Sequence, residues 1–153
     1  MQIRKARGED AASLVLFNRA MALETEGIRL DEETLTAGVH AVLSTADRGF
    51  YVVAEEDGEV AGGLLVTREW SDWRNAWFWW IQSVYVVPQA RGKGIYRELS
   101  AFVWALAVEV GDVCGIRLYV EKENRTAQTV YRRLGMHETD YLMYEQSSPN
   151  LGK

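Results

Sequence analysis

The sequence predicts a single domain of the α/β class, with helices and strands sharing one core. Segments with helical spacing of apolar residues are interleaved along the chain with runs of β-branched and aromatic residues. The chain has 153 residues, of which 48% are hydrophobic, enough for one sizeable core and too few for two ordinary domains. No proline-rich, serine-rich or single-sign charge run divides it into parts.

The first third is predicted to form a short strand followed by two helices. A strand over residues 2–7 leads to Asp10, a favourable helix cap. Leu14 and Phe17 then begin an apolar stripe at helical spacing. Asp31 is expected to cap the second helix in the same way.

The middle of the chain changes to a β pattern. Residues 50–56 and 59–68 are β-rich runs that flank the hairpin dipeptide Asp57-Gly58. After a polar break, the aromatic and β-branched run at 76–87 predicts a long central strand.

The last third alternates between helix and strand. The expected elements are a helix at 95–110, a strand at 116–121, a helix at 124–134 and a strand at 136–145. Gly111 and Gly135 are expected to end the two helices. The order β, α, α, β, β, β, α, β, α, β predicts a mixed sheet. Residues 1–146 form the predicted domain, and 147–153 a polar tail.

Charge and composition limit the partners. The formal net charge is −5, which opposes binding to nucleic acid or anionic membranes and favours cationic substrates. The N-terminus lacks the pattern of a signal peptide, and no apolar run approaches the roughly 20 residues of a spanning helix. A cytoplasmic protein is therefore expected. One cysteine and two histidines argue against a zinc site or a catalytic thiol, so no metal is predicted.

A glycine-rich turn is the most informative segment. The predicted central strand ends at Pro88, the basic turn Arg91-Gly92-Lys93-Gly94 follows, and a helix begins at once. Glycines let the backbone approach a ligand closely, and the first N–H groups of the helix offer donors and a positive dipole end. The pattern indicates a pyrophosphate site. The alternatives are a flexible strand-to-helix connection without a ligand and, for Lys93, an ordinary solvated loop lysine.

Two segments together resemble the GNAT superfamily of acyl-CoA-dependent N-acetyltransferases. The stretch Arg91-Gly92-Lys93-Gly94-Ile95-Tyr96 is similar to the family's acetyl-CoA signature, although Tyr96 stands where a small residue is usual. The stretch 123–136 is similar to the later motif, with Asn124, Ala127, Tyr131 and Gly135 at matching spacings. The order of elements also matches, so the resemblance covers nearly the whole chain.

The resemblance implies a fold, a co-substrate and a set of binding residues. The implied fold has a mixed, mostly antiparallel sheet of six to seven strands flanked by four helices, with its two central strands splayed apart to admit pantetheine. The implied co-substrate is acetyl-CoA and the acceptor a small-molecule or peptide amine. The expected cofactor-binding residues are Val84, Val86, Arg91, Gly92, Lys93, Gly94, Ile95, Tyr96 and Asn124.

Transfer of an acetyl group to an amine needs a polarised carbonyl and a proton for the departing thiolate. The backbone amide of Val84 or Val86 can polarise the carbonyl. In the resembling enzymes a tyrosine at the position of Tyr131 is the general acid, whereas spacing alone favours a core tyrosine. Asn124 can cap its helix and also contact the cofactor.

The general base is open at the level of sequence. Many family members have a glutamate on the central strand where this chain has Gln82, which cannot take a proton at neutral pH. The base is then a water relay or an acid of the Glu24 to Glu26 loop. Glu24 and Glu26 are accordingly candidate substrate contacts, with solvated surface acids as the alternative.

Five of the six tryptophans fall within eleven residues, between Trp70 and Trp80. Strand alternation puts Trp77 on one face with Ser83, and Trp80 on the other with Gln82. Trp73 and Trp77 are candidate walls of the acceptor pocket, although core packing or a homodimer interface explains large aromatics as well. A non-catalytic acyl-CoA sensor is the alternative function, and Gln82 favours it. A binding domain without a CoA site requires both motifs to be accidental.

Overall fold

The computed structural model describes residues 1–150 and contains two compact units, Met1–Tyr119 and Val120–Lys153. Within the described residues, no helix is long and apolar enough to cross a membrane.

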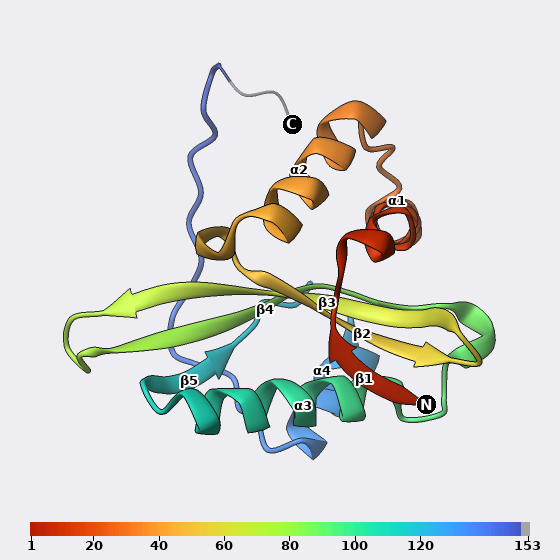
Figure 1. Cartoon of the computed structure of the whole chain (residues 1–153). Coiled ribbons are helices and arrows are strands. Elements are labelled where there is room, and N and C mark those ends of the chain that lie inside the picture. Colours follow the sequence, from red (N-terminus) through yellow and green to blue (C-terminus); the bar gives the residue numbers. More distant parts are fainter. Residues whose placement is uncertain (151–153) are drawn as a thin grey trace. The chain divides into compact units, whose positions relative to one another are not determined.

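The first unit is built on one sheet of five strands in chain order (Figure 1). The strands are β1 (Gln2–Lys5), β2 (Phe50–Glu56), β3 (Glu59–Ser71), β4 (Ala76–Val86) and β5 (Val113–Arg117). Neighbours from β1 to β4 pair antiparallel, and β5 pairs parallel to β4. The predicted α/β class and the mixed, mostly antiparallel sheet are confirmed.

Helices cover both faces of this sheet. The helices α1 (Ala11–Glu26) and α2 (Glu32–Ser44) lie on one face, and α3 (Ile95–Val110) lies on the other (Figure 1). Asp31 caps α2 as predicted, because its carboxylate accepts the Thr34 N–H at 2.9 Å. Gly111 ends α3 in the left-handed conformation, also as predicted.

Strand alternation fills a core on each face. On β2, Val52 packs in the cluster under α3, and Val53 packs in the cluster under α1 and α2. On β3, Leu64 belongs to the α3 side and is fully buried, as is Leu99 from the helix. Because both faces of the middle strands are buried, their sequences are nearly continuous apolar runs.

The second unit contains α4 (Arg125–Arg133), the fourth α-helix. The predicted helix is confirmed together with its cap, since the Asn124 side chain accepts the Ala127 N–H at 3.1 Å. Gly135 follows the helix with a φ of 88°, the left-handed conformation typical of a glycine after a helix end.

The predicted count of six to seven strands is not confirmed. The sheet of the described residues has five strands, and the expected strand over 136–145 is not formed. A strand needs a hydrogen-bonded neighbour as well as β-forming residues, and this segment has none in the sheet. Its bulky side chains, Tyr141, Leu142, Met143 and Tyr144, are exposed.

Two other strand boundaries differ from the prediction. The strand expected at 116–121 lies at Val113–Arg117, because β5 pairs with β4 only from Trp77 to Trp80. In turn, β3 continues into the polar break as far as Ser71, and Trp70 pairs opposite Trp77.

Asp10 has a different role from the predicted helix cap. It precedes α1 without a side-chain cap to that helix. Its carboxylate instead accepts two hydrogen bonds from Arg4, at 2.8 and 3.0 Å, and one from the Arg7 N–H at 2.6 Å. The Arg4 and Asp10 side chains are only 12% and 4% exposed, and Arg4 also pairs with Glu55. Asp10 therefore joins the start of α1 to the edge of the sheet.

The substitution Asp10→Asn should lower the free energy of unfolding at pH 7 by about 3 kcal/mol, because it leaves a buried guanidinium without its main partner. The hydrogen bond from Arg4 holds the pKa of Asp10 below its ordinary value of 3.8. The stabilisation is therefore complete above pH 4 and disappears as the pH falls through the lowered pKa. Urea unfolding of both proteins between pH 7 and pH 2 measures this difference.

The control for this experiment is Asp47→Asn, which changes an exposed aspartate in the short helix η2 (Ala46–Arg48). We expect it to alter stability by less than about 0.5 kcal/mol. Equal stabilities for the wild type and Asp10→Asn at pH 7 would contradict the structural role of the ion pair.

Candidate active site

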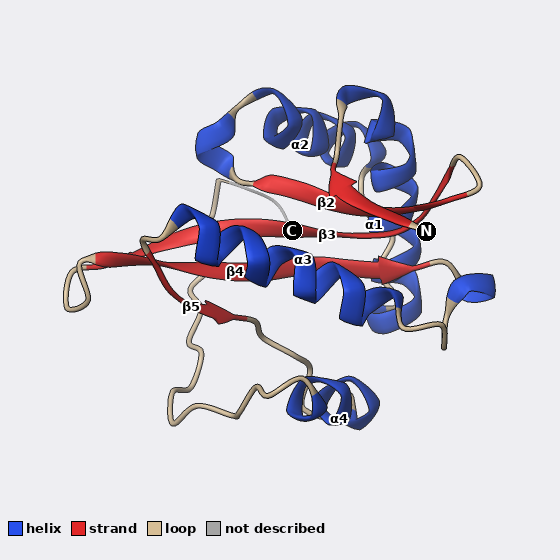
Figure 2. Cartoon of the chain, turned by 60° about the horizontal axis from the view of Figure 1, so that its bottom comes forward, coloured by secondary structure: helices blue, strands red, loops and turns tan. Residues whose placement is uncertain are grey.

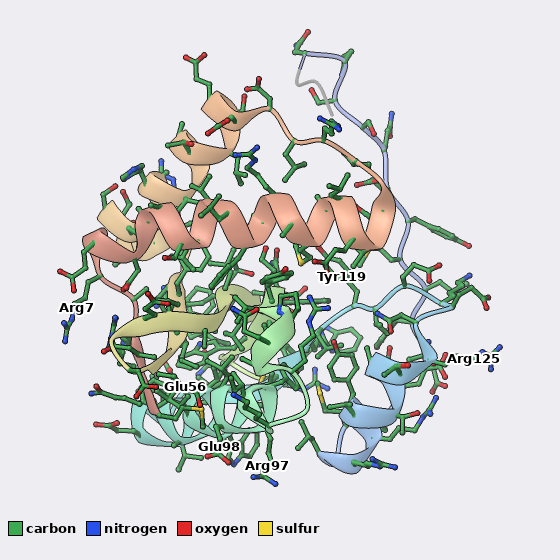
Figure 3. The ribbon with its side chains drawn as sticks, turned by 90° about the vertical axis from the view of Figure 1, so that its right-hand side faces the viewer. Arg7, Glu56, Arg97, Glu98, Tyr119 and Arg125 are labelled. Atoms are coloured by element: carbon green, nitrogen blue, oxygen red, sulfur yellow. The ribbon has the colours of Figure 1, made fainter. Side chains whose placement is uncertain are left out.

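The glycine-rich turn lies between β4 and α3, after the short helix η3 (Pro88–Ala90). Gly92 and Gly94 have φ angles of 78° and 79°, a left-handed conformation that other residues rarely adopt. An added Cβ at Gly92 would meet nothing within 4 Å, so the turn leaves open space above its backbone. Arg97 and Glu98, in the first turn of α3, point away from the sheet (Figure 3).

The start of α3 offers backbone donors. No side chain caps the helix at Gly94, and the first helical bond runs from the Glu98 N–H to the Gly94 carbonyl. The N–H groups of this helix start therefore precede the first bond of the helix. Ile95 itself is buried, with its side chain in the core under α3. Buried packing of Ile95 thus fixes the helix end that presents these donors.

The turn contains two basic side chains, and both contact acidic side chains. Arg91 forms an ion pair with Glu24 at 2.8 Å, and its Nε donates to the Val86 carbonyl at 2.9 Å. Lys93 lies 3.8 Å from a Glu56 oxygen and is more exposed. Arg91 is thus held by the protein, whereas Lys93 is loosely placed.

Glu24 connects three elements at this end of the first unit. The Tyr85 hydroxyl donates to its Oε1 at 2.9 Å, while Arg91 binds Oε2. The Arg91 guanidinium also lies over the Tyr85 ring, 5.3 Å from its centre. We call Glu24, Tyr85 and Arg91 the Glu24 cluster. It joins the end of α1 to the end of β4 and to the glycine-rich turn, while Glu26, two residues further on, is exposed.

The charges of the Glu24 cluster are fixed at neutral pH. The hydrogen bonds from Arg91 and then Tyr85 hold the pKa of Glu24 below its ordinary value. Burial, and after it the hydrogen bond to Glu24, raises the pKa of Tyr85. The carboxylate is therefore ionised and the phenol protonated.

A β-bulge at Ser83 reverses the alternation of β4. Gln82 pairs with Leu65 and Tyr85 pairs with Gly63, so β4 has one more residue than β3 in this interval. Ser83 has a φ of 52°, which is unusual for a residue other than glycine.

As a result, Val84 and Val86 join Trp79 and Ile81 in the core under α3. Tyr85 contacts Phe17 of α1 on the opposite face, with ring centres 5.3 Å apart. The simple alternation that groups Trp77 with Ser83 and Trp80 with Gln82 therefore does not continue past the bulge.

The same interval of β4 has an open edge. Pairing with β5 ends at Trp80 opposite Arg117, and β4 continues to Val86 (Figure 2). The Val87 N–H donates to Ala61 of β3, and N–H groups alternate in direction along a strand. The Val86 N–H, and with it the Val84 N–H, therefore points to the edge that β5 has left.

On the face of Tyr85, the open interval adjoins Gln82, which the sequence indicated, and further side chains that it did not indicate as site residues. The Gln82 amide donates to Thr67 at 2.6 Å. Two residues back along β4, the Trp80 ring lies 6.2 Å from the ring of Tyr119, the residue labelled near α1 in Figure 3. Glu69 accepts bonds from the Trp80 indole and from Arg117. Period-two spacing from Gln82 indicates Trp80, whereas nothing local indicates Tyr119.

The two tryptophans proposed for the acceptor pocket lie elsewhere in the first unit. Trp73 is 86% exposed in the turn between β3 and β4. Trp77 packs edge-on against Trp70, with ring centres 4.8 Å apart, and against the core under α3. From Trp77 to Val86 the strand extends about 30 Å, so neither tryptophan is brought to the Glu24 cluster.

In the second unit, Tyr131 lies on the last turns of α4 and is half-buried. Burial raises the pKa of its hydroxyl above the ordinary value, so the phenol is protonated at neutral pH. A proton donor needs this state. Asn124 begins the same helix with its side-chain oxygen engaged in the cap.

Comparison with known proteins identifies the family. The model of the Acetyltransferase (GNAT) family matches residues 17–136, and the chain belongs to this family. A possible acetyltransferase from Clostridium difficile 630 is 44% identical, with a TM-score of 0.90 over 96% of this chain and 97% of its own.

Two further proteins extend the comparison. The uncharacterized N-acetyltransferase YhfO of Bacillus subtilis (strain 168) is 29% identical over 146 residues, 94% of this chain and 95% of its own length. A predicted acetyltransferase from Clostridium acetobutylicum, solved with acetyl-CoA, shares the fold at 22% identity, with a TM-score of 0.77 over 95% of each chain. The protein is thus an acetyl-CoA-dependent acetyltransferase, as its sequence motifs predicted.

The residues of the first unit fit this co-substrate. The open space at Gly92, the backbone N–H groups at the start of α3 and the basic side chain of Lys93 suit a pyrophosphate. The outward N–H groups of Val84 and Val86 suit an extended amide chain such as pantetheine. Within the described residues, no group of three or more His, Cys, Asp or Glu side chains could hold a metal ion.

Proposed function

We propose that the protein transfers the acetyl group of acetyl-CoA to a primary amine of a small molecule or peptide, by direct attack in a ternary complex. The observation that carries this proposal is the open edge of β4 beside a glycine-rich turn at a helix start. The backbone from the end of β4 to the start of α3 offers hydrogen-bond donors for an extended thioester and for its phosphates. We also propose that the predicted domain, residues 1–146, works in the cytoplasm.

The binding residues have separate tasks. Acetyl-CoA supplies an activated acetyl thioester. The N–H groups of Ile95 and Tyr96 hold phosphate oxygens through hydrogen bonds and the helix dipole. The Val84 N–H, directed outward by the bulge, polarises the acetyl carbonyl, and the Val86 N–H aligns the pantetheine arm.

Proton transfer is assigned to Tyr131 and to water. The protonated phenol of Tyr131 donates to the departing thiolate. Gln82 cannot take the proton of the amine, so its amide orients a water that does. The proposed contacts with a cationic amine are Glu24 and Glu26, and a net charge of −5 draws such an amine toward the protein.

The aromatic pair Trp80 and Tyr119 lies on the same face of β4 as Gln82 and is the better candidate for a pocket wall than Trp73 or Trp77. A flat or cationic group packs well against such rings.

The second candidate function is an acyl-CoA sensor without turnover, and Gln82 in place of a carboxylate is the observation that favours it. Thiol release from acetyl-CoA, measured with polyamines, aminoglycosides, amino acids and peptides, separates the two. We expect at least one amine class to accelerate release. A protein that binds acetyl-CoA but responds to no amine would support the sensor.

Acetyl-CoA should raise the melting temperature of the protein, because a ligand that binds only the folded state stabilises it by mass action. At 100 times its Kd, a ligand adds about 2.7 kcal/mol, which corresponds to about 5 to 10 °C for a chain of this size. Thermal unfolding with and without millimolar acetyl-CoA measures the shift. An unchanged melting temperature would contradict the co-substrate assignment for this chain.

A further inference from the structure

Arg91 has two competing partners in the proposed active site. As part of the glycine-rich turn it is expected to bind the pyrophosphate, yet its guanidinium is bound to the Glu24 carboxylate at 2.8 Å. Both side chains are partly exposed, at 47% for Arg91 and 43% for Glu24. Ion pairs at such sites are weak and exchange readily.

A phosphate group is the stronger partner for this arginine. Guanidinium and phosphate form two parallel hydrogen bonds with full charge on both sides, and a pyrophosphate carries more negative charge than one carboxylate. The Nε of Arg91 is bound to the Val86 carbonyl at 2.9 Å, which keeps the guanidinium at the open edge of β4. The Tyr85 hydroxyl holds the other oxygen of Glu24 and can retain the carboxylate without Arg91.

We propose that Glu24 is a positioning residue that holds Arg91 in the cofactor-free protein and yields it to the pyrophosphate of acetyl-CoA. Breaking this pair opposes cofactor binding, so Glu24 sets the affinity for acetyl-CoA below its attainable value. The inference rests on the proposed function of the turn as the pyrophosphate site. Removal of the negative charge of Glu24 from the active site should therefore strengthen cofactor binding.

The test is a double-mutant cycle with Glu24→Gln and Arg91→Gln, read out as Kd by calorimetry. Acetyl-CoA should bind Glu24→Gln about two- to fivefold more tightly than wild type, the range that one exposed ion pair permits. In the Arg91→Gln background, the same change at Glu24 should have no effect. S-acetylpantetheine, which has the thioester arm without phosphates, should bind wild type and Glu24→Gln equally.

A second variant separates the contact from the charge. Glu24→Asp keeps the negative charge but shortens the side chain by one methylene, so it should also bind acetyl-CoA more tightly. Melting temperatures of all variants are measured first. Weaker or unchanged acetyl-CoA binding in the folded Glu24→Gln and Glu24→Asp proteins would overturn the proposed exchange of Arg91 from Glu24 to the pyrophosphate. Glu24 would then either support phosphate binding by Arg91 or have no effect on it.

If Glu24→Gln also tightened acetyl-CoA binding in the Arg91→Gln background, or tightened the binding of S-acetylpantetheine, the exchange would be overturned as well. The tighter binding would then reflect general charge repulsion. The wild type in the same titration tests the proposed function separately. If it fails to bind acetyl-CoA, the cofactor site itself is overturned, and the exchange with it. If it binds normally and no variant tightens, only the exchange is overturned.

Discussion

The substitution Gly94→Glu should abolish the stabilisation of the protein by acetyl-CoA. It places a carboxylate beside the start of α3, where the phosphates are expected. Two like charges about 4 Å apart near a protein surface repel by about 4 kcal/mol, which corresponds to a loss of affinity of about 10²- to 10³-fold. Calorimetric titration with acetyl-CoA measures the loss directly.

Backbone strain at the substituted position needs its own control. Gly94 has a φ of 79°, and an added Cβ would lie 3.4 Å from the Arg97 side chain. Gly58, in the hairpin between β2 and β3, has a φ of 82° with nothing near its Cβ position. Gly58→Glu therefore introduces similar strain and the same charge away from the turn, and should retain acetyl-CoA affinity. If the folded Gly94→Glu protein binds acetyl-CoA like Gly58→Glu, the turn is not the phosphate site.

The substitution Tyr131→Phe should lower the rate of acetyl transfer by about 10²-fold and leave acetyl-CoA binding intact. General acid catalysis contributes about 10² to 10⁴ in rate, and the lower end applies because a thiol leaves easily. The phenylalanine keeps the packing of the ring and removes only the hydroxyl group that carries the proton. Steady-state rates with the best amine of the panel, together with Kd for acetyl-CoA, measure the two effects separately.

The pH profile supplies a further readout for Tyr131. Because burial raises the pKa of its hydroxyl above the ordinary value of 10.0, loss of this proton should not reduce the wild-type rate below about pH 10. Tyr144→Phe, an exposed tyrosine of the same unit, is the matched control and should behave as wild type. A wild-type rate in a folded Tyr131→Phe protein would show that Tyr131 is only a packing residue.

Features that depend on neighbouring residues along the chain were predictable from the sequence. The glycine-rich turn and the start of α3 follow from glycines and an apolar period within about twenty residues. The caps at Asp31 and Asn124 are equally local, since each side chain bonds an N–H three residues further on. Family membership followed because two such local motifs occur in the right order.

Features that depend on distant partners were not predictable in this way. Asp10 has the sequence context of a helix cap, but Arg4 on β1 is its partner, supported by Glu55 on β2. Glu24 and Arg91 are 67 residues apart, and no local pattern pairs them. The strand expected at 136–145 failed for a related reason, because β propensity cannot supply the neighbour that a strand requires.

The bulge at Ser83 fixes the direction of every residue that follows it in β4. If all the residues from Gln82 to Tyr85 followed regular strand alternation without the bulge, Tyr85 would turn toward α3, away from Glu24. The outward N–H groups of the two valines would then face β3, and the open edge would lose both donors. The one extra residue that β4 has in this interval is therefore itself part of the active-site architecture.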